Sequence, residues 1–266
     1  MHNNSRLSAR AITTIVAAVV LIVVSFLGSV PLPQDPAYHD FADSRRLLQI
    51  DNFGNVASNL PFLIFGAMGL VYVVRHARTV CVPGLQGAYV IFFLGVLLTA
   101  FGSAYYHREP NNETLVWDRL AMTIGSAGLF AIITGEFVSV RLARRMLVPL
   151  LAAGLISVAY WAVTEASGNG DLRPYAVIQF LPTLLIPIML YFYQPAVGSS
   201  NVYWLMFAFY AFAKLFEYFD AAIFAIGLLV SGHTLKHLLA SLITATLLAA
   251  LWQRRRNSED TAHASN

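Results

Sequence analysis

Charged residues are scarce in this sequence: Asp, Glu, Lys and Arg make up 12% of its 266 residues, against about 25% in ordinary soluble domains. Cysteine is almost absent, and the single Cys81 excludes both an intramolecular disulfide and a cysteine-based zinc site. Hydrophobic residues make up 58% of the chain. One soluble core cannot hide that much apolar surface, whereas lipid solvates the outward faces of a membrane protein. The composition therefore predicts a multi-pass membrane protein.

Eight apolar segments are each long enough, at about 20 residues, to cross a bilayer. They are residues 11–32, 55–75, 84–106, 117–139, 146–164, 174–194, 202–226 and 234–252. Their length favours helices, because a barrel would have short alternating strands. Turn-rich connectors such as "VPGLQG" and "SGNGDLRP" separate them. The sequence thus predicts an all-α membrane protein.

Arginines indicate which ends of these helices face the cytoplasm, because basic residues concentrate in short cytoplasmic loops. If both termini are cytoplasmic, one side of the membrane receives Arg6, Arg10, Arg75, Arg78, Arg141, Arg144, Arg145, Arg254, Arg255 and Arg256. The other side then has most of the acidic loop residues. We therefore predict a protein of the cell membrane with both termini inside. The net charge of +3 is too small and too scattered to indicate nucleic-acid binding, and no protein partner is evident.

Four regions follow from this topology. Residues 1–32 form a cytoplasmic N-terminus and a first helix, 33–54 an acidic extracytoplasmic segment, 55–252 a seven-helix core and 253–266 a disordered cytoplasmic tail. Residues 11–30 can also be read as a signal sequence. An anchor is favoured because the apolar run is longer than a usual signal core and lacks a clear cleavage site.

Polar residues from three predicted helices fall at the same outer depth of the membrane. Ser103 and His107 end the third span, Asp118 opens the fourth, and His233 and His237 open the eighth. The last two are four residues apart, so their rings share one helix face, with Cβ atoms about 5–6 Å apart. Two-histidine zinc sites on helices use this spacing.

These residues suit metal-assisted hydrolysis. Three imidazoles leave zinc an open fourth position for water, whose pKa the metal lowers toward 7. Asp118 is positioned to take the water's proton, and Ser103 to stabilise an oxyanion. Singly, each residue has an ordinary structural reading: capping or packing for the histidines, packing for Ser103 and capping for Asp118. Together they favour a metal site, because ionisable groups within membrane helices are costly and usually functional.

Two further polar clusters lie near the same side. The segment "YHDFADSRRLLQIDNFGNVASN" is rich in the oxygen ligands that calcium prefers, although helix capping explains its Asp and Asn residues equally well. The seventh span contains Lys214, Glu217 and Asp220 at helical spacing. Asp220 is a candidate for orienting a ligand histidine, and a proton or ion pathway is the alternative. Lys236 is expected to face away from the histidines, toward lipid or an acidic partner.

The combination of "SAYYH" (103–107), "WDRLAM" (117–122) and "HTLKH" (233–237) resembles the CREST superfamily of seven-helix membrane hydrolases, which includes the adiponectin/progestin receptors. The resemblance covers nearly all of residues 38–252. Two further stretches, "NFGNVASN" and "DFADSR", are similar to the alkaline ceramidase branch. The eight predicted spans then comprise a CREST-type bundle plus one extra N-terminal helix.

The resemblance implies a function and a set of ligands. It implies a zinc-dependent amidohydrolase that cleaves a ceramide-like N-acyl lipid, with zinc on His107, His233 and His237 and the active site toward the extracytoplasmic side. It also implies calcium ligands at Asp40, Asp43 and Asn52, although Arg45 replaces an oxygen ligand of that family and Phe41 stands in place of a tryptophan. A receptor-like CREST protein with structural zinc is one alternative. A proton-coupled transporter using Lys214, Glu217 and Asp220 is another.

Overall fold

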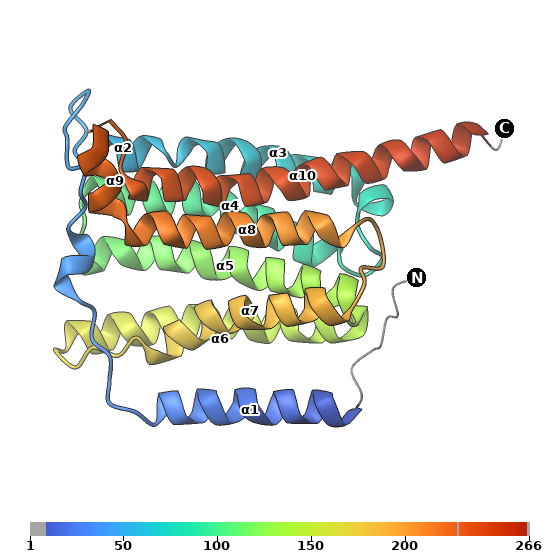
Figure 1. Ribbon diagram of the computed structural model, residues 1–266, viewed down its shortest axis with the longest axis horizontal. Helices are drawn as coiled ribbons and strands as arrows, with labels where there is room; N and C mark the ends of the chain where they lie inside the picture. The colour runs from blue at the N-terminus through green and yellow to red at the C-terminus, as the bar shows by residue number, and fades with distance from the viewer. Residues whose placement is uncertain (1–8, 228, 265–266) are drawn as a thin grey trace.

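The computed structural model describes residues 9–227 and 229–264, and it is built of helices joined by loops (Figure 1). Within these ranges there is no β-strand, and the only ladder contact is an isolated bridge between Leu47 and Ile50. The predicted all-α class is confirmed. The elements are α1 (Ala9–Leu27), the short 3₁₀ helix η1 (Pro36–His39), α2 (Phe53–Ala57), α3 (Leu60–Val80), α4 (Gln86–Arg108), α5 (Asn112–Phe137), α6 (Val140–Ala166), α7 (Arg173–Phe192), α8 (Ser200–Tyr218), α9 (Asp220–Gly227) and α10 (Gly232–Ala264).

Six stretches of the described chain are long and apolar enough to cross a membrane: Phe53–Val80, Gln86–Arg108, Asn112–Phe137, Val140–Ala166, Arg173–Phe192 and Gly232–Thr261. They correspond to six of the eight predicted spans. The first predicted span contains a shorter apolar helix, Val16–Leu27. The predicted span 202–226 is interrupted, because α8 ends at Tyr218 and α9 begins at Asp220. A seven-plus-one arrangement of membrane helices stays a prediction.

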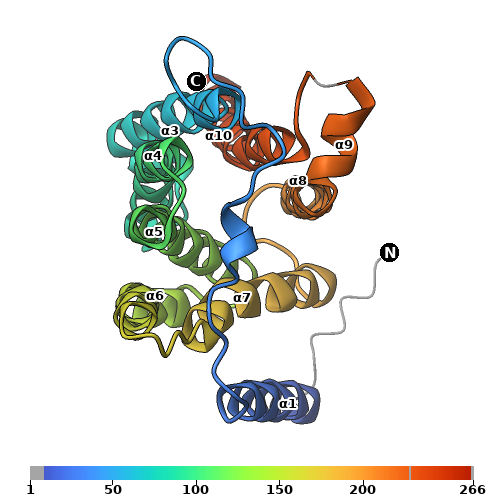
Figure 2. The same cartoon turned by 90° about the vertical axis from the view of Figure 1, so that its left-hand side faces the viewer.

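The long helices alternate in direction along the chain (Figures 1 and 2), and side chains from several of them line a cavity. Helices α4 and α5 form the most extensive contact, while α10 packs against α3 and α8, and α7 against α5 and α6. Gly95 and Gly125 permit the close approach of α4 and α5, since a Cβ atom on Gly95 would lie 2.4 Å from the Cα of Gly125. Small residues serve this purpose widely between membrane helices. Helix α1 lies outside the bundle against α7.

The two ends of the bundle differ in character. Helix α1 begins, and α10 ends, at the end where α3 turns into α4 (Figure 1). The histidine-bearing ends of α4 and α10 lie at the opposite end, and the segment between α1 and α2 crosses that end (Figure 2). The separation matches the topology expected from the arginines. Which end faces the cytoplasm stays a prediction.

Residues 253–266 were predicted to form a disordered cytoplasmic tail. In the structure, helix α10 continues through this segment to Ala264, and of the tail residues only 265–266 lie outside the described chain. Arg254 fixes the start of this extension through an ion pair with Glu136 of α5 at 2.8 Å. The next residue, Arg255, pairs at 2.7 Å with Glu259, four positions further along, a spacing that stabilises helices. Polar composition alone therefore does not exclude a helix in this segment.

Candidate metal centre

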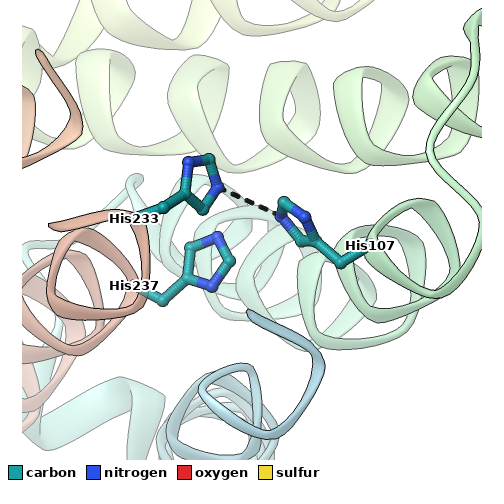
Figure 3. Close-up of side chains that lie close together, drawn as sticks. All are labelled: His107, His233 and His237. Atoms are coloured by element: carbon teal, nitrogen blue, oxygen red, sulfur yellow. Dashed lines mark hydrogen bonds between the residues drawn. The ribbon is translucent and has the colours of Figure 1, made fainter. Parts of the chain in front are cut away.

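Three histidines converge where α4 ends and α10 begins. His107, His233 and His237 are 1%, 6% and 3% exposed, and their ligand nitrogens all lie within 4.8 Å of one another. Figure 3 shows the three rings turned toward a common centre. The predicted gathering of these side chains is confirmed. Among the described residues, this is the one group of three or more His, Cys, Asp or Glu side chains arranged closely enough to hold a metal ion.

The distance between His107 and His233 fits a tetrahedral ion. The Nε2 atoms of His107 and His233 are 3.3 Å apart, and two nitrogens that share a tetrahedral zinc ion at 2.0–2.1 Å would be about 3.3 Å apart. The Nδ1 atom of His107 is buried without a hydrogen-bond partner in the described chain. Imidazole ligands suit zinc, copper, iron and nickel alike. The histidines therefore indicate a metal centre without identifying the metal.

Ser58 orients His237. Its hydroxyl donates to the carbonyl of Asn55 at 3.0 Å and lies 2.8 Å from Nδ1 of His237. Since the hydroxyl has only one proton, it accepts from Nδ1–H, and the lone pair of Nε2 is left for a metal. Such outer hydrogen bonds commonly fix the tautomer of ligand histidines. Sequence reasoning placed the polar run around Ser58 at a helix start and missed this contact.

Asp220 holds the first turn of α10. One carboxylate oxygen accepts the backbone N–H of His233 at 2.7 Å, and the other accepts that of Ala42 at 3.0 Å. Gly232 allows the close approach, because a Cβ atom there would lie 2.1 Å from the carbonyl oxygen of Phe216. Asp220, predicted to orient a ligand histidine, thus contacts His233 through the backbone of that residue.

Ser103 and Asp118 lie beside the histidines. Both side chains are buried, and Asp118 accepts a hydrogen bond from Ser103. The contact is possible because α4 and α5 touch here: a Cβ atom on Gly102 would lie 2.5 Å from the carbonyl oxygen of Trp117. Phe41, from the segment that crosses this end, packs edge-on against His107 and His233 with ring centroids 4.6 Å away in both cases. Phe41 therefore covers the centre.

A cavity of about 240 Å³ leads away from the centre into the bundle. His237, Ser103, Asp118 and Lys236 line its polar end, and the remainder is mainly apolar. Along α5 the lining runs from Asp118 to Ile133, a distance of roughly 22 Å at 1.5 Å per residue. The space extends along α5 and is polar at the end beside the histidines.

Lys236 faces this cavity, which corrects the expectation that it faces away from the histidines. Its ammonium donates to Glu217 Oε1 at 2.8 Å and lies 3.1 Å from Nε2 of His233. Glu217 also pairs with Lys214. The expected acidic partner of Lys236 is confirmed. Because Glu217 compensates its charge, a second cation beside the histidines becomes tolerable.

Two of the three predicted calcium ligands make contacts within the protein, and the third is exposed. Both carboxylate oxygens of Asp43 accept from the guanidinium of Arg45, each at 2.7 Å. The side-chain amide of Asn52 donates to the carbonyl of His107 at 2.9 Å. Asp40 is exposed. Calcium binding at this segment stays a prediction.

The sequence was also compared with known proteins. No family model matches it, and no curated protein matches it at a significant level. The resemblance to alkaline ceramidases is therefore neither supported nor opposed by these comparisons.

Proposed function

We propose that this protein is a zinc-dependent amidohydrolase of the cell membrane that cleaves the amide bond of a ceramide-like N-acyl lipid. One observation carries the proposal: a buried three-histidine centre opens, beside a carboxylate and a hydroxyl, onto a long apolar cavity. Catalytic zinc sites keep three protein ligands and an open position. The lipid head group that we propose rests on the resemblance of the sequence motifs to alkaline ceramidases.

Each residue of the site has its own role in the proposed hydrolysis. His107, His233 and His237 would hold zinc, which when bound lowers the pKa of water and polarises a carbonyl. Asp118 takes a proton from the attacking water as the new C–O bond forms, and it gives that proton to the nitrogen as the C–N bond breaks. Ser103 donates to Asp118 in this structure. Once Asp118 carries the proton of the water, the hydroxyl of Ser103 turns to the negative oxygen of the former carbonyl and stabilises it.

The cavity supports an amphiphilic substrate. Its apolar length suits an acyl chain, and its polar end suits an amide beside the histidines. Gln179 also lines it, and the Oε1 atom of Gln179 is buried without a hydrogen-bond partner in the described chain. A buried acceptor is costly when unpaired, so an amide N–H or a hydroxyl of the substrate would satisfy it. Calcium is not part of the proposal, since the carboxylate of Asp43 forms an ion pair with Arg45.

Metal content tests the proposal first. We expect about one zinc per chain in protein purified without chelators, loss of that zinc in His233→Ala, and retention in the control His76→Ala, which lies at the opposite end of the bundle. Absence of zinc from the wild type would refute the hydrolase.

Turnover is the second test. Asp118→Asn should keep zinc and hydrolyse N-acyl sphingoid bases at least about a hundred-fold more slowly, as expected for loss of a general base. Zinc binding without hydrolysis of any N-acyl lipid by the wild type would instead favour the receptor-like alternative.

A further inference from the structure

A second hollow, of about 420 Å³, lies between α3 and α10 at the end opposite the histidines. Its apolar part is a stripe of α3 made by Ala67, Met68 and Val71, and Trp252 of α10 contributes to the wall. Met68 and Val71 are 43% and 48% exposed. In a membrane this stripe would contact acyl chains.

Basic residues gather where the apolar stripe ends. Arg75 and His76 line the hollow, and the guanidinium of Arg255 lies 2.9 Å from Nε2 of His76. The helical backbone is interrupted at His76, with φ −123° and ψ 16°. Arg75 is exposed, and within the described residues it has no ion pair.

Within the part of the chain that the structure describes, the arginines of this region have few acidic partners. The one carboxylate that pairs with Arg255 belongs to Glu259, whose side chain is 52% exposed. In the described chain Arg75 therefore has no acidic partner, and Arg255 has one that is exposed to solvent. An arginine presents five N–H donors in a planar fork that suits phosphate oxygens. Arg255 shares its donors among Glu259, His76 and Tyr72, whereas Arg75 is exposed.

We propose that this hollow binds an anionic glycerophospholipid of the adjacent leaflet. Its phosphate would lie between Arg75 and Arg255, and one acyl chain would follow Met68 and Val71. Trp252 would lie at the boundary between head group and chain, the depth at which tryptophan is enriched in membrane proteins. Basic residues next to a membrane helix attract anionic lipid. The site is independent of the proposed hydrolysis.

A second copy of this chain fits the hollow less well. A symmetric contact would place Arg75 and Arg255 of both copies against one another, and like charges brought together in an interface are unfavourable. An anionic lipid supplies both an apolar chain for the stripe on α3 and a negative charge for the arginines.

Lipid retention by the purified protein tests the site. Native mass spectrometry should show that the wild type prefers phosphatidylglycerol to phosphatidylcholine with the same acyl chains. The double variant Arg75→Gln/Arg255→Gln should bind phosphatidylglycerol roughly five-fold more weakly for each arginine removed, with binding of phosphatidylcholine unchanged. Brominated phosphatidylglycerol should quench tryptophan fluorescence in the wild type more than in Trp252→Phe.

The matched control is Arg141→Gln/Arg145→Gln, which removes two exposed charges from the first turns of α6 at the same end of the bundle. We expect it to keep the preference. An equal loss in both double variants would mean a diffuse surface effect and would overturn the site. Absence of a preference in the wild type, or a dimer that excludes lipid, would overturn it too.

Discussion

Arg254 of α10 binds both carboxylate oxygens of Glu136 of α5, each at 2.8 Å, at the end of the bundle opposite the histidines. Tyr203 donates to the same carboxylate at 2.6 Å, and Tyr89 donates to it as well. Glu136 is only 2% exposed. The four side chains come from α4, α5, α8 and α10, so the cluster joins these helices. Tyr203 also lines the long cavity, which places the cluster beside it.

Loss of this ion pair should destabilise the protein. Arg254→Gln leaves the buried carboxylate of Glu136 without its cation, and removal of one partner of a buried pair typically costs about 3–5 kcal/mol. The loss would be measured by unfolding the protein in mixed micelles that contain an increasing proportion of a denaturing detergent. The control Arg256→Gln changes an exposed neighbour and should stay within about 0.5 kcal/mol. A loss below about 1 kcal/mol in Arg254→Gln would contradict the role assigned to the pair.

The features that the sequence predicted well are those that depend on composition over long segments of the chain. Apolar length located six spans, and the arginines separated the two ends of the bundle, because membrane solvation imposes both patterns. The histidine group was predictable because the spacing within a helix and the depth of a residue in its own membrane span can both be read from the nearby sequence. The break between Tyr218 and Asp220 was not, since the apolar pattern continues through "FEYFDAAIFAIG" without a glycine or proline at the break.

Contacts between distant residues explain the remaining errors. Ser58 and His237 are 179 positions apart, and no spacing in a single sequence indicates such a pair. Lys236 is different, because it follows His233 by three positions. Residues three apart share a helix face, so its location beside His233 was deducible, and the expectation that it faces elsewhere was wrong.

The segment that crosses the metal centre should be sensitive to acid. The hydrogen bonds from Arg45 hold the pKa of Asp43 below its ordinary value of 3.8. A lowered pKa contributes stability that is fully present above pH 3.8 and is lost as the pH falls through the lowered value. Asp43→Asn should therefore melt at a lower temperature than the wild type at pH 6, and the difference should shrink below pH 3.8.

Asp51→Asn provides the control for this experiment. Asp51 pairs with Arg46 at 3.5 Å and both side chains are mostly exposed, so the substitution should change the melting temperature little. An Asp43→Asn difference that persists unchanged at pH 3 would show that the carboxylate charge is not what holds the segment.

Ser58→Ala should weaken metal binding without removing a ligand. The hydroxyl fixes the tautomer and ring of His237, and loss of such an outer partner typically costs 10–100-fold in metal affinity. Competition with a chelator of known zinc affinity would measure the change. Ser241→Ala is a matched control, because this buried serine of α10 donates to the carbonyl of Leu238 and has no contact with a histidine in the described chain. Equal affinities for all three proteins would disprove the orienting role.

Glu217→Gln separates the hydrolase from the transporter alternative. Without this carboxylate, the ammonium of Lys236, 3.1 Å from Nε2 of His233, would face the centre uncompensated. Zinc affinity should then fall about ten-fold or more, as for other outer-sphere changes, and Glu217→Gln/Lys236→Met should recover much of it because both charges are gone. Lys214→Gln, at a half-exposed lysine, should change zinc affinity little. A transporter predicts a different result: Glu217→Gln would abolish proton-coupled flux in proteoliposomes while zinc affinity stayed at the wild-type value.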